Sequence, residues 1–384
     1  MREHGSLAAV AAHLGHSRPS LASHVHKQGL REACEEARRT HRASKVTPRK
    51  LGSQVSREEI LEQELQEARD QLQRARSEEV KEERVIATLA DLLPAKEPRY
   101  RPRPITRSQR KAAHTLVLLW SDTHAAEVVS AEEVNGANSY SWDIMLERHD
   151  QLRRGVLSWA ERFGPVEELV VLGLGDMLSG NIHDELAETN EMPLAEATVQ
   201  FGLDGAEFLE SFVEHFPKIR FAGVVGNHPR PTRKPRAKHR FDNADWTCYQ
   251  IMAQRLARHP SISFEVPKAQ THPVEIYDRR ILCQHGDGVR SSMVGVPWGG
   301  IIRHEARLRN QYAAQGIPFD HLAIGHYHEA NVVSNRRVWV NGSVKGLDEY
   351  SLQAFGGGHS PAQLLIPFHP EHGMVGAQYI DLNE

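Results

Sequence analysis

The chain of 384 residues has only three cysteines, Cys34, Cys248 and Cys283, and they lie far apart. This odd, dispersed set excludes a disulfide framework and a Cys-x-x-Cys zinc site. Long apolar runs are also missing, since no uncharged apolar stretch approaches the roughly twenty residues that span a bilayer. The first residues lack the apolar core of a secretion signal as well. We therefore expect a cytoplasmic protein with no membrane partner.

The composition is that of a folded protein, with 40 % hydrophobic and 25 % charged residues, which excludes collagen-like, mucin-like and fully disordered classes. The length predicts two domains, or one large domain with attachments. The net charge of −3 hides an uneven distribution. The first 114 residues carry 23 Lys+Arg against 16 Asp+Glu, and the other 270 carry 24 against 34. Such asymmetry is typical of chains whose parts bind different partners.

The first 55 residues contain a pattern of two short helices. Apolar residues from Leu7 to Leu14 recur at helical spacing, Gly15 ends the first helix, and Ser17 can cap a second one. The segment resembles a helix-turn-helix, and basic residues continue to Lys50. We therefore predict a helix-turn-helix-like basic region at 1–55 that binds DNA. The alternative is a helical hairpin that serves only for packing.

Residues 56–93 predict one long helix. Its apolar residues alternate by four and three, which is the seam of a short coiled coil, at Leu61, Leu65, Ala68, Leu72 and Ala75. We expect a homodimer through this helix, or a solvated helix packed on its own body. Residues 94–114 combine four prolines with many arginines and lysines, which predicts an extended, solvated linker.

The pattern changes at residue 115, where short strand-like runs end in polar loops and alternate with helical stretches at 144–163 and 194–215. This alternation predicts an α/β domain over 115–384. Side chains that follow strands gather at one edge of such a sheet. Candidates for a shared site stand one to three residues past five such runs: Asp122, His124, Asp176, Asn227, His228, His285, His326 and His328.

These side chains are carboxylates, one carboxamide and imidazoles, a donor set that suits Mn²⁺, Fe or Zn²⁺. No thiol belongs to the set, which disfavours a structural zinc site. Seven ligands are too many for one ion and suit two ions that share a bridging ligand. The sequence therefore predicts a centre with two divalent ions.

The order of the motifs carries a resemblance to a known family. The chain reads Asp122-x-His124, Gly175-Asp176, Gly226-Asn227-His228, His285-Gly286 and Gly325-His326-x-His328. This order resembles the calcineurin-like metallophosphoesterase superfamily over residues 114–384. The resemblance implies a two-sheet β-sandwich flanked by helices, here preceded by a helical N-terminal region.

The resemblance also implies roles for the candidate residues. The first ion would be held by Asp122, His124, Asp176 and His328. The second would be held by Asp176, Asn227, His285 and His326, with Asp176 as the bridge. A metal-activated hydroxide would attack the phosphoester, with Mn²⁺ as the expected ion and Fe or Zn²⁺ as alternatives. His228 would face the substrate and stabilise its charge or protonate the leaving oxygen.

Two positions depart from the family pattern. Pro229 stands where an acidic residue often follows Gly-Asn-His, and Ser179 replaces the second acid of the protein-phosphatase motif. These departures disfavour a protein phosphatase. They also leave no carboxylate that can be named as the partner that orients His228.

The residues after His228 are strongly basic. Residues 229–240 carry six Lys+Arg and no acid, inside a domain that is net negative. Such a loop would grip a polyanion over the metals, unless it is only a solvated charge run. Trp246 and Tyr249 pack in the core or stack on bases. We predict substrate contacts from Arg230, Arg233, Lys234, Arg236 and His183.

The leading hypothesis is a metal-dependent DNA nuclease that hydrolyses phosphodiester bonds. The alternatives are a phosphatase or phosphodiesterase acting on nucleotides or DNA ends, a protein phosphatase, and a DNA-binding regulator whose phosphoesterase domain has lost activity.

Overall fold

The computed structural model describes residues 83–102, 113–289 and 295–383. The helix-turn-helix-like region at 1–55 and residues 56–82 of the predicted coiled coil lie outside these described residues. Residues 83–92, the last part of the predicted helix at 56–93, are helical. Within the described ranges, no helix is long and apolar enough to cross a membrane.

The larger of two sheets has seven strands, in the order β11-β10-β1-β2-β3-β4, with β12 paired to β10. Strands β1 to β4 run parallel to their neighbours, and β10 is antiparallel to β1. The strands are β1 (His114–Trp120), β2 (Val166–Gly173), β3 (Lys218–Gly223), β4 (Ile262–Glu265), β10 (Ala362–His369), β11 (Gly373–Met374) and β12 (Gln378–Asp381).

The second sheet has five strands, in the order β5-β6-β7-β9-β8. Its central strands β6, β7 and β9 are parallel, and an antiparallel strand closes each edge. The strands are β5 (His272–Ile276), β6 (Arg279–Gln284), β7 (His321–Ile324), β8 (Asn331–Val333) and β9 (Val338–Val340).

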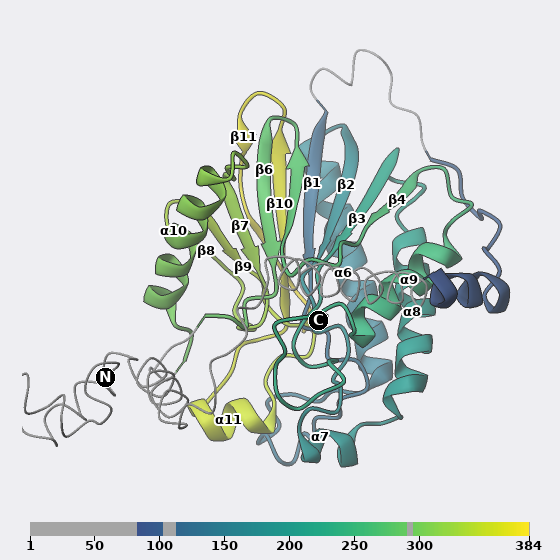
Figure 1. Ribbon diagram of the computed structural model, residues 1–384, viewed down its shortest axis with the longest axis vertical. Helices are drawn as coiled ribbons and strands as arrows, with labels where there is room; N and C mark the ends of the chain where they lie inside the picture. Colours follow the sequence, from purple (N-terminus) through teal and green to yellow (C-terminus); the bar gives the residue numbers. More distant parts are fainter. Residues whose placement is uncertain (1–82, 103–112, 290–294, 384) are drawn as a thin grey trace, which may run out of the picture. The chain divides into compact units, whose positions relative to one another are not determined.

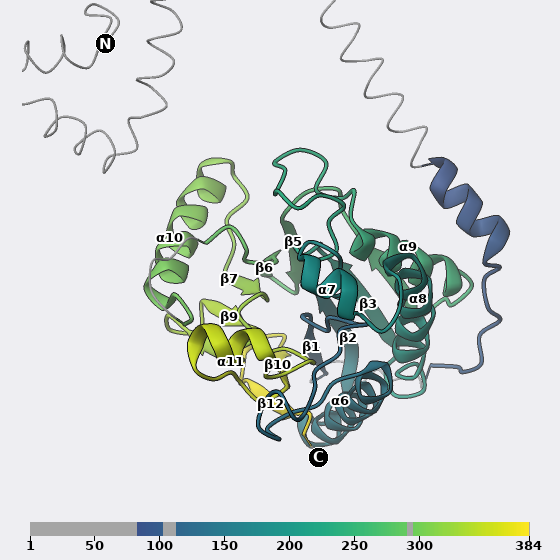
Figure 2. The ribbon, with the colours of Figure 1, turned by 90° about the horizontal axis from the view of Figure 1, so that it is seen from below.

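Helices cover the outer faces of both sheets (Figure 1). Residues of α6, α8 and α9 pack on the outer face of the first sheet, and α10 packs on the second. Seen from below, α7 and α11 lie across the end of the sheets (Figure 2). The helices are α6 (Trp142–Phe163), α7 (Asp184–Thr189), α8 (Leu194–Glu210), α9 (Ala244–Arg255), α10 (Trp298–Ala314) and α11 (Glu349–Phe355).

Strand β1 shows why the sheets form a sandwich. Alternate side chains of a strand point to opposite faces. Leu116, Leu118 and Trp120 lie in the core beneath the helices, while Val117 and Leu119 lie in the core between the two sheets. A strand that is apolar on both faces must be covered on both, and here one cover is helical and the other is a sheet. The predicted two-sheet sandwich with flanking helices is confirmed.

The predicted helical stretches correspond to α6 and α8, and α8 ends five residues before the predicted boundary. The described part of the predicted linker, residues 94–102, contains no helix or strand. It is not simply solvated, because the Lys96 amide donates to the Arg255 carbonyl at 2.9 Å and its ammonium contacts Glu210 at 2.8 Å. The buried Glu210 carboxylate requires a cationic partner, and Lys96 provides it.

Helix α6 carries a buried histidine, His149, whose Nε2 accepts a hydrogen bond from Trp120 Nε1 at 3.1 Å. Burial lowers the pKa of His149 to about 3. In the unfolded chain this pKa is near 6.5, so between pH 6.5 and 3 His149 becomes protonated in the unfolded state but stays neutral in the folded state. The free energy of unfolding therefore falls as the pH drops from 6.5 toward 3, by up to about 1.4 kcal/mol per pH unit from this group.

We expect His149→Gln, which keeps an acceptor for Trp120 but does not titrate, to make this acid dependence shallower by about 0.7 kcal/mol per pH unit at pH 6.5 and by about 1.4 at pH 5.0. Urea unfolding of the metal-free protein between pH 6.5 and 5.0 measures the slope. His215→Gln, at an exposed histidine after α8, is the control. Equal slopes for wild type and His149→Gln would show that His149 does not titrate in this way.

Candidate metal centre

The predicted site residues follow β1, β2 and β3 in the first sheet and β6 and β7 in the second. Because these strands end at the same edge of the sandwich, their loops converge. The backbone ties the loops together: the Asp122 amide donates to the Gly175 carbonyl at 3.0 Å, and the Gly325 amide donates to the His285 carbonyl at 2.9 Å. The structure brings all seven predicted ligands to this edge, in two groups.

The first group contains Asp122, His124 and His328, whose ligand atoms lie within 4.8 Å of one another. The Nε2 atoms of His124 and His328 are 3.1 Å apart. His328 Nε2 lies 3.5 Å from Asp122 Oδ1. Two imidazole nitrogens and a carboxylate oxygen therefore face one point.

The second group contains Asp176, His285 and His326, again with ligand atoms within 4.8 Å. His285 Nε2 lies 2.9 Å from Asp176 Oδ2 and 3.0 Å from Asn227 Oδ1. Asp176 also forms a third cluster with His124 of the first group and His228. It therefore lies between the two groups, where the predicted bridging ligand belongs.

Oxygen atoms lie behind two of the imidazole rings. His285 Nδ1 donates to the Leu174 carbonyl at 2.8 Å, which leaves Nε2 to face Asp176. His124 Nδ1 is buried without a hydrogen bond and lies 3.5 Å from a Glu127 oxygen. The other Glu127 oxygen accepts from the buried Lys345 ammonium at 2.8 Å. Carboxylates and carbonyls behind imidazoles are typical supports of metal-ligating histidines.

The backbone of the centre is unusual. Asp122, His124, Asp176, His326 and His328 all have positive φ, between +49° and +73°. Residues other than glycine rarely adopt this region, and such strain gathers at functional sites. Five of the seven predicted ligands share it.

Charge in the metal-free centre is balanced between neighbours. Burial lowers the pKa of His124, and it lowers the pKa of His326 to about 4, so both rings are neutral at pH 7. Burial also opposes protonation of His285, but the Asp176 carboxylate outweighs it and raises that pKa to about 10. At pH 7 in the metal-free protein, the His285 ring is therefore protonated and carries a positive charge beside the Asp176 carboxylate. The donor set of carboxylates, an amide oxygen and imidazoles fits divalent ions, which would displace this proton.

His228 lies beside the ligands. Its amide donates to Asp176 Oδ1 at 2.8 Å, and its ring packs edge-on against His124 with centroids 4.5 Å apart. Its Nδ1 donates to the Ser179 carbonyl at 2.9 Å. The orienting partner is thus a backbone carbonyl rather than a carboxylate. His183 is exposed, and its ring centroid lies 5.8 Å from that of His228.

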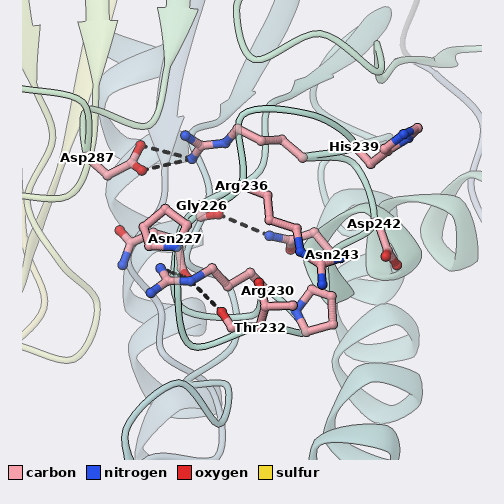
Figure 3. Close-up of a pocket in the computed structure, with 12 residues that line it drawn as sticks. Gly226, Asn227, Arg230, Thr232, Arg236, His239, Asp242, Asn243 and Asp287 are labelled. Carbon is pink, nitrogen blue, oxygen red and sulfur yellow. Dashed lines mark hydrogen bonds and ion pairs between the residues drawn. The ribbon is translucent and has the colours of Figure 1, made fainter. Parts of the chain in front are cut away.

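Arg230 shapes the basic loop itself (Figure 3), and Arg240 joins the loop to a neighbouring segment. Arg230 donates to the carbonyls of Asn227, Thr232 and Arg233. Arg240 pairs with both oxygens of Asp287 at 3.0 Å. Both line a pocket that Asn227 and Asp287 also line. The Arg240–Asp287 pair ties the loop to the segment that follows β6, and the Arg230 contacts hold the loop's own shape.

The remaining cations of the loop are differently placed. Arg233 pairs with Asp184, the first residue of α7. Lys234, Arg236 and Lys238 are exposed, and no side-chain hydrogen bond or ion pair engages them among the described residues. Trp246 and Tyr249 are both buried, so they pack in the core and are not available to stack on bases.

One buried carboxylate near the centre belongs to no sequence motif. Asp245, at the start of α9, accepts hydrogen bonds from the backbone amides of Asp176, Met177 and Gly226. Burial raises its pKa to about 7. The only sequence signal is its place after Asn243, which caps the helix.

No family model matches the chain, and no curated protein is similar to it in sequence. Solved structures are similar at low identity. Vps29 from Entamoeba histolytica with zinc has 14 % identity over 70 % of this chain and 99 % of that one, with a TM-score of 0.27. Vps29 from Cryptosporidium parvum has 13 % identity over 70 % and 99 %, with a TM-score of 0.30. An archaeal phosphodiesterase has 13 % identity over 69 % and 99 %, with a TM-score of 0.30.

Proposed function

We propose that this chain, whose two-sheet fold is that of the calcineurin-like metallophosphoesterases, is a metal-dependent phosphoesterase that cleaves phosphodiester bonds in DNA. The observation that carries the proposal is the position of Asp176, whose carboxylate lies between the two groups of imidazole and carboxylate ligands. Two divalent ions would be held there, by the residues named for each group. When bound, such ions polarise a phosphoryl group and lower the pKa of a water molecule.

The chain's own residues supply the rest of the chemistry. His228 has its Nδ1 engaged by the Ser179 carbonyl, so Nε2 is the ring atom left for a substrate oxygen. A ring held at a fixed angle can hydrogen-bond a phosphoryl oxygen or hand a proton to the leaving oxygen. Because Asp176 also accepts the His228 amide, the ring keeps a fixed position relative to the bridging carboxylate.

DNA as the substrate is supported by the basic loop beside the centre. The exposed side chains of Lys234, Arg236 and Lys238 form no ion pair among the described residues. The loop that carries them is held in place by Arg230 and Arg240. A rigid loop with exposed cations can track a phosphate backbone and hold one diester over the ligands. The predicted helix-turn-helix-like region at 1–55 would add a second contact with DNA.

The test is hydrolysis by the purified full-length chain with Mn²⁺ of end-labelled single- and double-stranded DNA and of bis-(p-nitrophenyl) phosphate. We expect both DNA and the small diester to be cleaved, and EDTA to abolish both activities. Cleavage of the small diester with intact DNA would move the assignment to nucleotides or DNA ends. Binding of DNA without any hydrolysis would overturn the phosphoesterase proposal and favour a regulator.

The double variant Lys234→Ala/Arg236→Ala tests the basic loop. We expect the KM for DNA to rise by about tenfold. The slope of log KM against log salt concentration should also fall by about 1.4, because each phosphate contact to a single strand contributes about 0.7 to that slope. Turnover of bis-(p-nitrophenyl) phosphate should not change. The control Arg336→Ala/Arg337→Ala removes two exposed arginines just before β9, at the opposite end of the parallel strands. Equal salt slopes for wild type and the loop variant would remove these cations from the DNA contact.

A further inference from the structure

Asp245 is a fully buried carboxylate that makes hydrogen bonds to three backbone amides of other loops. Its Oδ2 accepts from the amides of Asp176 and Gly226, both at 2.9 Å, and its Oδ1 accepts from the amide of Met177 at 3.0 Å. Its exposure is 0 %. A carboxylate can accept this many bonds because it offers about four lone-pair positions on two oxygens.

The two loops that Asp245 joins both carry proposed ligands. One loop contains Asp176 itself, and the other continues from Gly226 to Asn227. The loops approach so closely that any side chain at position 226 would collide with the Asp176 carboxylate. Asp176 also holds a φ of +52°, which costs free energy unless the surroundings impose it. Because the amides of Asp176 and Gly226 both donate to Asp245 Oδ2, this oxygen fixes the backbone conformation of Asp176 and the distance between the two loops.

The carboxylate is itself held in place from the helix side. Asn243 accepts from the Asp245 amide at 2.9 Å and donates to the Gly226 carbonyl at 3.0 Å. Buried side chains of α9, including Cys248, Tyr249 and Met252, anchor the helix on the first sheet. Asp245 therefore links a rigid helix to two ligand loops.

We propose that Asp245 is a positioning residue that holds Asp176 and Asn227 in their metal-binding arrangement, and that it thereby sets the affinity of the second ligand group for a divalent ion. The inference rests on the proposed function, since it concerns the same centre.

Asparagine is the informative replacement because it keeps the shape and removes half of the acceptor capacity. If its oxygen takes the Oδ2 position, its amino group faces the Met177 N–H, donor against donor. In the opposite orientation, the amino group faces the amides of Asp176 and Gly226. Either orientation loosens at least one ligand loop, because two donors cannot share a hydrogen bond.

The experiment measures Mn²⁺ binding to the full-length chain by equilibrium dialysis at low temperature, on variants whose folding has been verified. For Asp245→Asn we expect one of the two ions to bind about 10–100-fold more weakly, the usual loss when a support of a metal ligand is removed. The matched control is Asp242→Asn, the same chemical change at an exposed aspartate just before α9. The control should bind two ions like wild type.

The melting temperature of the metal-free protein separates positioning from stability. A structural role alone would lower the melting temperature of Asp245→Asn and leave the Mn²⁺ affinity of the folded protein unchanged, which would overturn the proposal. If Asp245→Asn does not fold, Asp245→Glu decides, because it keeps the charge and displaces the oxygens by one methylene. Wild-type affinity in the folded glutamate variant would also overturn it. A wild-type chain that binds no ion would instead overturn the proposed function, and the inference with it.

Discussion

Replacing Asp176 with asparagine is expected to lower kcat/KM for bis-(p-nitrophenyl) phosphate by about 10⁴-fold, which corresponds to ~5 kcal/mol. The reason is that one carboxylate faces both ligand groups and accepts the His228 amide. Its loss removes negative charge from both places where a divalent ion would bind. Steady-state kinetics with saturating Mn²⁺, together with the number of ions retained after dialysis, measures the effect.

The control for this experiment is Glu188→Gln, the same change from carboxylate to amide on the exposed surface of α7, which follows the same strand. It should retain full activity and two bound ions. Asp176→Asn that keeps both ions and loses less than about tenfold in rate would contradict the bridging role, because the remaining ligands would then suffice.

Replacing His228 with alanine is expected to lower kcat by about 10²–10³-fold while both ions stay bound. His228 lies beside the ligands with its Nδ1 held by Ser179, and we propose that its Nε2 acts on the substrate. The measurement combines kcat and KM on the small diester with metal content. This retained metal distinguishes His228→Ala from Asp176→Asn.

His215→Ala, at an exposed histidine after α8, controls for the loss of an imidazole. If His228→Ala loses an ion along with its activity, His228 belongs to the ligand set, as its proximity to His124 and Asp176 permits. In that case the assignment of His228 to the substrate side would be wrong.

The strand ends could be predicted from the sequence because β1 is apolar without a break and its run stops at a polar loop. The same reasoning placed Asp122, Asp176 and His285 at one edge, since parallel strands end together. The division into two sheets was implied by the family resemblance and not by the alternation of elements. Pairing of β10 with β1 joins residues more than two hundred positions apart, and no local pattern encodes it.

The supports of the site could not be predicted, for a physical reason. The partner of His228 is the backbone carbonyl of Ser179. Because every residue has a backbone carbonyl, the sequence carries no signal for this contact. Asp245 acts on backbone amides, which carry no side-chain signature in the loops it binds. The basic loop reads as one run of charge, yet Arg230 is turned inward and Lys234 is exposed. Sequence shows which groups are present, and folding decides which of them remain available.

Each ligand group takes residues from both sheets: Asp122 and His124 follow a strand of the first sheet, and His328 follows β7 of the second. An ion bound in either group would therefore cross-link the two sheets at their open end. Its affinity would then depend on the spacing between the sheets, which is set by packing of residues such as Trp339 and Phe368 in the core between them. A substitution in this core, far from the ligands, would then be expected to change the affinity of the centre for a divalent ion.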